Sequence, residues 1–169
     1  SLNSVTNIAQ RNGLKVFDVD KIAVHGGSLR YYLTHTENNN LNKSGKVEAL
    51  HLEEQQAGMK ELKTYEQFAQ HCNSIKNQFC KFVYDTIAEG KKLACYGAAA
   101  KGNTLLNYAG IKADLLPAVA DRAQSKQGKL LPGSHIPVIS PEQLAAESAD
   151  TLLVLPWNII EELRHQLPG

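Results

Sequence analysis

Hydrophobic and polar residues alternate in the first part of the chain, and this pattern predicts two strands. Residues 14–24 (LKVFDVDKIAV) and 29–34 (LRYYLT) are also rich in β-branched and aromatic side chains, which favour strands. The sequence HGGS at residues 25–28 lies between them and is typical of a tight turn, so we expect an antiparallel hairpin. Residues 3–12 precede the hairpin as a short helix end.

A polar, Asn-rich segment at residues 37–45 (ENNNLNKSG) is the clearest linker in the chain. It separates the hairpin from residues 57–92, in which apolar side chains recur at every third or fourth position. That spacing predicts a helical stretch with room for one break. We therefore expect a domain boundary here, with residues 1–42 on one side and residues 43–169 on the other.

From residue 93 onward, short apolar runs alternate with helical segments. The predicted strands are residues 93–96, 118–120, 136–139 and 151–155, and the predicted helices are residues 103–109, a segment that starts at Pro141, and residues 159–166. Strands that alternate with helices imply a parallel sheet. The sequence thus predicts an α/β fold, in which a small Rossmann-like parallel sheet of about four to five strands is flanked by helices and preceded by a β-hairpin.

Charge and composition exclude several classes of partner. Lys plus Arg number 18 and Asp plus Glu number 17, so the net charge of +1 offers no footprint for nucleic acid or an acidic membrane. No apolar run reaches the roughly 18 residues that a transmembrane helix needs. Cys72, Cys80 and Cys95 form no CxxC pair, so we expect free thiols in a reducing cytoplasm. The scattered histidines and cysteines show no zinc-ligand spacing, which predicts no metal site.

The loop after the first strand of the α/β region carries a pattern typical of nucleotide binding. Residues 97–102 (GAAAKG) match the fingerprint G-x-G-x-x-G except at Ala99, which replaces the glycine that lets backbone approach a pyrophosphate. The next helix can still hold an anion at its amino end. Asp121 ends the following strand, where an acidic residue often binds ribose. The candidate ligand-binding residues here are Gly97, Ala98, Lys101, Gly102, Asn103 and Asp121. The alternative is that the glycines serve packing alone.

Further candidates lie at the same edge, because the carboxyl ends of parallel strands lie together. Arg122, Lys126 and Lys129 bring positive charge that suits a phosphate-bearing ligand, although Lys126 and Lys129 also fit a solvated basic loop. Trp157 and Asn158 follow the fourth strand, and Trp157 can either stack on a base or sugar or cover the core.

His25, in the turn of the predicted hairpin, is the best candidate for a general base. An imidazole titrates near neutrality and can abstract a proton at physiological pH. The alternative is a turn histidine that is exposed or hydrogen-bonded and has no catalytic role.

Several segments together resemble the carboxy-terminal region of the sugar C-methyltransferases, which are three-part enzymes that methylate a carbon of nucleotide-linked keto-sugars. The segments, in this order, are VHGGSLRY (24–31), YGAAAKGNTLLNY (96–108), DR (121–122), KQGK (126–129), PGSHIPV (132–138) and LPWN (155–158). The resemblance spans nearly the whole chain.

This resemblance implies an enzyme with an amino-terminal zinc-binding module, a central domain that binds S-adenosylmethionine, and a carboxy-terminal Rossmann-like domain that helps to hold the nucleotide-sugar. Residues 1–42 would be the tail of the donor-binding domain, and residues 43–169 the complete terminal domain. The zinc ligands and the donor site would lie in missing parts on which this chain packs, so the fragment alone should be inactive.

The resemblance also gives His25 its expected role, because the histidine of the HGGS turn is placed at the active site in the family. His25 would remove a proton alpha to a ketone, and the enolate would attack the donor methyl group. Some members carry acidic and tyrosine residues shortly before this histidine, where this chain has Val24 and Ile22, which leaves open the substrate, the identity of the base and the carbon that is methylated. The alternative function is a non-catalytic Rossmann-like nucleotide-binding or assembly module. A nucleotide-dependent reductase fits less well, because Ala99 and the short sheet disfavour a dinucleotide.

Overall fold

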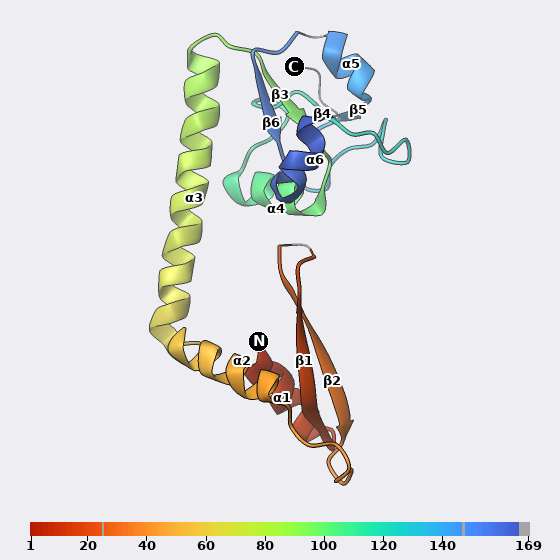
Figure 1. Cartoon of the computed structure of the whole chain (residues 1–169). Coiled ribbons are helices and arrows are strands. Elements are labelled where there is room, and N and C mark those ends of the chain that lie inside the picture. The colour runs from red at the N-terminus through yellow and green to blue at the C-terminus, as the bar shows by residue number, and fades with distance from the viewer. Residues whose placement is uncertain (25, 147, 166–169) are drawn as a thin grey trace. The chain divides into compact units, whose positions relative to one another are not determined.

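The structure is a computed structural model of the chain, and it describes residues 1–24, 26–146 and 148–165 (Figure 1). The chain divides into two compact units, residues 1–70 and residues 71–169, and each has its own hydrophobic core. Helix α3 (Leu62–Ala88) begins in the first unit and ends in the second. The expected boundary between residues 42 and 43 concerns the domains of a longer protein and stays a prediction.

The first unit contains the predicted hairpin. Helix α1 (Leu2–Arg11) leads into β1 (Leu14–Ile22), which pairs antiparallel with β2 (Ser28–His35), and a register irregularity lies between Val16 and Asp18. Strand β1 ends two residues earlier than predicted, because Ile22 pairs with Ser28 and closes the ladder at that point. Gly26 and Gly27 follow in the left-handed region, with φ values of 84° and 113°.

A helix that the sequence pattern does not predict completes the first unit. Helix α2 (Gly45–Gln56) packs on β1 and α1, and the small core joins one face of the hairpin to both helices. The core residues are Leu2, Val16, Val19, Val47 and Leu50. The periodicity of α2 is weak because Val47 and Leu50 are buried while Leu52 is 56% exposed, so its apolar side chains do not gather on one face.

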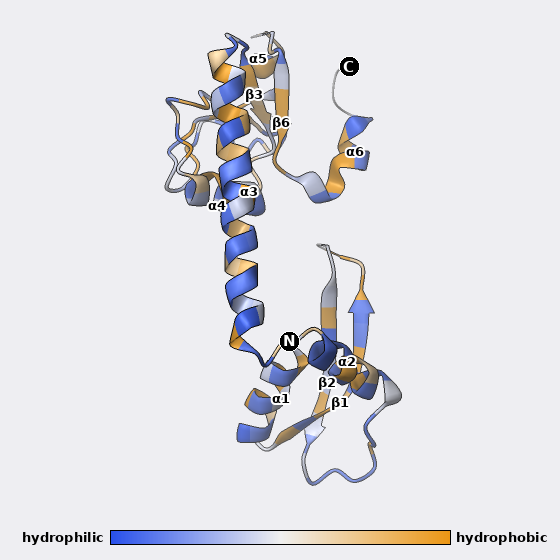
Figure 2. Ribbon diagram, turned by 90° about the vertical axis from the view of Figure 1, so that its left-hand side faces the viewer, coloured by the Kyte–Doolittle hydropathy of each residue, from blue (hydrophilic) through white to orange (hydrophobic). Residues whose placement is uncertain are grey.

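The predicted helical stretch over residues 57–92 is narrower in the structure. Residues 57–61 form a turn around Gly58, and α3 then runs from Leu62 to Ala88. Figure 2 shows its apolar and polar turns alternating along its length. In the second unit, Phe79, Cys80 and Val83 of α3 pack on the core of the sheet.

The sheet of the second unit is parallel and has four strands, as the sequence predicts. Its strands are β3 (Leu93–Tyr96), β4 (Val119–Ala120), β5 (Val138–Ile139) and β6 (Thr151–Val154), in the order β5-β4-β3-β6. This is the order 3-2-1-4 of a Rossmann half. The chain adds β4 and β5 on one side of β3 and then returns to add β6 on the other. The point of reversal therefore lies between β3 and β6.

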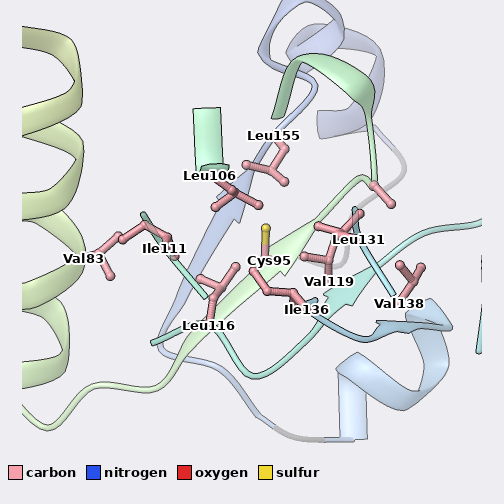
Figure 3. Close-up of a cluster of buried hydrophobic side chains, with 11 residues drawn as sticks. Val83, Cys95, Leu106, Ile111, Leu116, Val119, Leu131, Ile136, Val138 and Leu155 are labelled. Carbon is pink, nitrogen blue, oxygen red and sulfur yellow. The ribbon is translucent and has the colours of Figure 1, made fainter. Parts of the chain in front are cut away.

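Helices cover both faces of this sheet. Successive strand residues point to opposite faces, so neighbouring residues of one strand belong to different cores. On one face, Cys95, Val119 and Val138 join the core beneath α3 and α4 (Ala100–Ala109). On the other face, Tyr96 and Ala120 pack with α5 (Pro141–Ala146) and α6 (Ile160–Arg164). Figure 3 shows the first core, where the Cys95 thiol lies among aliphatic side chains from α4 and the loops around it. Cys95 is fully buried and is a free cysteine.

Several element boundaries of the second unit also differ from the sequence prediction. Helix α4 begins at Ala100 instead of residue 103, because the alanines and Lys101 are good helix formers. Strand β5 begins at Val138, since Pro137 instead forms an antiparallel bridge with Leu130, and the Leu131 amide donates to the carbonyl of Ile136 across the turn at residues 132–134. The last helical segment starts as the 3-10 helix η1 (Trp157–Ile159), directly after Pro156.

Candidate functional site

The loop after β3 meets the loop after β6 at the point where the strand order reverses. Gly97 has a φ of 90°, and a Cβ atom there would lie 2.4 Å from Cδ of Pro156. The Gly97 amide donates to the carbonyl of Ala120 at 2.7 Å, and the Leu155 amide donates to the carbonyl of Tyr96 at 3.0 Å. Any side chain at position 97 would push these loops apart. In open α/β sheets, this crevice at the carboxyl ends of the strands is where ligands bind.

Helix α4 starts at this crevice with an open amino end. Its N-cap residue is Ala99, whose backbone is extended and whose side chain makes no capping bond. The amides of the first helical residues, Ala100, Lys101 and Gly102, have no intrahelical acceptor by helix geometry. Together with the helix dipole they form a surface that favours an anion.

Gly102 lies in the first turn of α4. A Cβ atom at this position would lie 2.4 Å from Cβ of Leu155, so the absence of a side chain lets α4 pack directly against the end of β6. This is the packing role that the last glycine of the dinucleotide fingerprint fulfils. The packing alternative therefore accounts for Gly102, and its predicted contact with a ligand stays a prediction.

Asp121 follows β4 and is the most connected side chain at this edge. Its side chain is 13% exposed, and one carboxylate oxygen accepts from the Ala98 amide at 2.8 Å and from the Lys126 ammonium at 3.0 Å. The other oxygen accepts from the Ala123 amide at 2.8 Å. Partial burial acts to raise the pKa of Asp121, but the hydrogen bonds from Ala123, Lys126 and Ala98 outweigh it and hold that pKa below its usual value.

Two neighbours that follow Asp121 complete this arrangement. Lys126 Nζ donates to the carbonyl of Ala98 at 2.9 Å in addition to its ion pair with Asp121. The side-chain amide of Gln127, which the sequence did not single out, donates to the backbone carbonyl of Asp121 at 2.8 Å.

A hydrogen-bonded pair of amide side chains on α4, Asn103 and Asn107, is a second feature that the sequence analysis missed. Their spacing of four residues on one helix could have indicated it. Asn107 donates to Asn103 and to the carbonyl of Pro132, and it thereby ties α4 to the loop before β5.

The remaining candidates lie on the surface of the same edge. Lys101 is exposed on the first turn of α4, and Arg122 is exposed next to Asp121. Trp157 is 50% exposed in η1, and Asn158 is exposed beside it, so both directly follow Pro156, the residue that meets Gly97. The structure thus brings most of the predicted ligand-binding residues to one sheet edge. Their contact with a ligand stays a prediction.

The predicted general base, His25, lies outside the described residues. Its neighbours on either side are described: Gly27 donates its amide to the carbonyl of Val24 at 3.0 Å, and the side chain of Ser28 donates to the same carbonyl at 3.2 Å. The catalytic role of His25 stays a prediction.

Within the described part of the chain, no three His, Cys, Asp or Glu side chains gather in a way that could hold a metal ion. Among residues 1–24, 26–146 and 148–165, no helix combines the length and apolar character needed to cross a membrane.

Comparison with known proteins places the chain in a family. Residues 23–169 match the family described as C-methyltransferase C-terminal domain. The chain is also 36% identical over 163 residues to the C-methyltransferase NovU of Streptomyces niveus. That alignment covers 96% of this chain but 39% of NovU, so the chain spans well under half the length of this relative. The chain belongs to the C-methyltransferase C-terminal domain family.

Proposed function

We propose that the chain is the substrate-binding part of a longer, S-adenosylmethionine-dependent enzyme that methylates a carbon of a nucleotide-linked keto-sugar. The observation that carries this proposal is the crevice at the reversal of strand order, where Gly97 meets Pro156 and the open amino end of α4 begins. The diphosphate would meet the first amides of α4 and the positive charge of Lys101 and Arg122. Trp157 would stack on the base or the sugar, beside Asn158.

The chemistry of the proposal depends on His25. A neutral imidazole would take the proton alpha to the ketone, and the electron pair left on carbon would form the enolate. The enolate would be the carbon nucleophile that receives the methyl group. S-adenosylmethionine supplies that methyl group when it is bound by another part of the longer protein, on which this chain would pack.

The described residues themselves do not fit the two groups that the family implies elsewhere. They contain no ligand set for zinc. The loop at Gly97 is assigned above to the nucleotide-sugar, so it does not also hold the methyl donor. We therefore assign zinc and the methyl donor to the remainder of the longer protein. The free state of Cys72, Cys80 and Cys95 supports a reducing, cytoplasmic location.

Nucleotide binding by the chain tests the first part of the proposal. Calorimetry should show that dTDP and dTDP-sugars bind, and that Lys101→Met weakens their binding by about threefold or more. Lys112→Met is the matched control, because Lys112 lies beyond the other end of the same helix and its loss changes the net charge equally. Absence of heat at millimolar ligand, or equal effects of both substitutions, would count against the proposal.

Proton abstraction by the longer protein tests the second part. In D₂O without methyl donor, the enzyme should exchange the proton alpha to the ketone of its sugar substrate, and His25→Gln should slow this exchange by about a hundredfold or more. His35→Gln, an exposed histidine at the far end of β2, is the control and should exchange normally. Retained exchange in the His25→Gln enzyme would instead support the non-catalytic binding module.

A further inference from the structure

The two polar groups of Ala98 are both bonded to residues that follow β4. Its amide donates to the Asp121 carboxylate at 2.8 Å, and its carbonyl accepts from Lys126 Nζ at 2.9 Å. Lys126 and Asp121 are also paired with each other at 3.0 Å, so the three residues form a closed ring of contacts. Ala98 is only 9% exposed, and the Ala123 amide anchors the second Asp121 oxygen at 2.8 Å.

This ring differs from the usual use of an acidic residue after the second strand of a Rossmann half. Such a residue normally directs its carboxylate to the ribose hydroxyls of a nucleotide. In this chain, one oxygen already has two donors and the other has one, and all three come from the protein. The oxygen bonded to Ala98 and Lys126 is therefore saturated, and a ribose hydroxyl could reach only the remaining lone pair of the oxygen bonded to Ala123.

We infer that Asp121 and Lys126 are positioning residues, which fix the loop at residues 97–99 and act on a bound nucleotide through that loop instead of touching its ribose or phosphates. This inference deepens the proposed function. It rests on that proposal only for the identity of the ligand as a nucleotide. The fixed loop sets where α4 begins, because the Ala99 amide donates to the Gly97 carbonyl at 2.8 Å and Ala99 is the N-cap of the helix. Asp121 and Lys126 thereby determine the direction in which the first amides of α4 point.

Hydrogen exchange of single amides tests the ring without any ligand. In the full chain, Asp121→Asn should speed exchange of the Ala98 amide by about tenfold or more, since the bond to a charged acceptor is lost. The Cys95 amide in the neighbouring strand reports on global stability, and it should change much less. Lys126→Met is a milder variant should Asp121→Asn not fold, and Lys126→Arg should restore slow exchange. Unchanged Ala98 exchange in both Asp121→Asn and Lys126→Met would overturn the inference.

A pair of nucleotides that differ only in the 2′-hydroxyl tests the positioning role. If Asp121 acts through the loop, Asp121→Asn should weaken the binding of dTDP and of 5-methyl-UDP by the same factor. If Asp121 instead binds the 2′-hydroxyl, the loss should fall mainly on 5-methyl-UDP, and the inference is wrong. For Lys126→Met, the salt dependence of the dissociation constant should keep its wild-type slope, whereas Lys101→Met should flatten it.

The two hypotheses fail in different ways. If neither nucleotide binds the wild-type chain, the proposed function fails, and amide exchange alone decides whether Asp121 and Lys126 hold the loop. If both nucleotides bind and Lys126→Met flattens the salt dependence as Lys101→Met does, the proposed function stands and the positioning role of Lys126 is overturned.

Discussion

The two units of the chain bury apolar side chains in different ways. In the first unit, a two-stranded hairpin is covered by α1 and α2, and the core has five buried members. Exposed ion pairs, such as Lys21 with Glu53 and Lys46 with Asp20, line the hairpin and α2. In the second unit, helices cover both faces of a four-stranded sheet, and the larger core contains residues with no exposed area at all.

This difference indicates how each unit is stabilised. A two-stranded hairpin is marginal in water unless another element covers its face, so the first unit depends on α1 and α2. The parallel sheet is buried on both sides and derives its stability from close-packed aliphatic side chains. We expect the second unit to be the more stable and the more sensitive to changes of side-chain volume.

The largest expected effect comes from a leucine deletion in each core. Leu106→Ala should lower the free energy of unfolding of the second unit by about 3–5 kcal/mol, because Leu106 is fully buried among rigid neighbours. Leu50→Ala, in the smaller core that can relax around the gap, should cost about 2 kcal/mol. Amide exchange of Cys95 and Val19 in urea reports the two units separately. Leu130→Ala, at a 58% exposed site, is the control, and equal costs in both cores would break the comparison.

A glycine substitution in each unit gives a smaller effect with opposite signs. Gly102→Ala would place a methyl group against Leu155, and should destabilise the second unit by about 1–3 kcal/mol. Gly45→Ala, at the start of α2, meets nothing within 4 Å, and it should be neutral or stabilise the first unit by up to about 1 kcal/mol. Thermal unfolding followed by circular dichroism measures both changes. A stabilising Gly102→Ala would contradict the close packing of α4 on β6.

Low pH should destabilise both units, but salt should change the size of this effect more in one unit than in the other. The pKa values of Asp121 and Asp20 both lie below their usual value, so each carboxylate contributes stability that is present near neutral pH and is lost as the pH falls through its lowered pKa. For Asp20, the lowering comes first from the hydrogen bond with Lys46 and then from Tyr32. Added salt should raise the pKa of exposed Asp20 more than that of Asp121, which is held by two backbone amides. NMR titration of both carboxyl groups at low and high salt measures these changes in pKa. A larger change for Asp121 than for Asp20 would contradict the prediction.

The smallest expected effect is on an exposed ion pair of the first unit. Lys21→Met removes the partner of Glu53, but both side chains are more than half exposed. The free energy of unfolding should change by about 0.5 kcal/mol or less, since water and salt screen such pairs. A loss above 1 kcal/mol in urea denaturation would show that the hairpin depends on its charges as well as on its core.

The sequence predicts the strands and the fold class well, because these depend on local patterns. Alternation over residues 14–22 and the apolar run at residues 151–154 each identify a strand without knowledge of its partner. Helix α2 is missed because its few buried side chains are chosen by the hairpin beneath it, which is a tertiary effect. The early start of α4 is missed because the fingerprint leads one to expect a loop up to Gly102.

The candidate site is predictable in composition but not in its bonding. Strand order brings residues after β3, β4 and β6 to one edge, as the motif implies. The bond between the Ala98 amide and Asp121, 23 residues away, depends on the register of β3 against β4, and no local pattern encodes it. The contact between Gly97 and Pro156 similarly needs β6 to lie beside β3.

The buried thiol of Cys95, at the centre of the sheet, can report on unfolding of the second unit. Burial raises the pKa of the Cys95 thiol far above its usual value, so an alkylating reagent finds neither access nor thiolate while the sheet is closed. Cys72 and Cys80 are only half-buried on α3, so they should react from the folded state. The modification rate of Cys95 therefore measures how often the second unit unfolds, and a ligand that binds at the crevice between β3 and β6 should slow it in proportion to its occupancy.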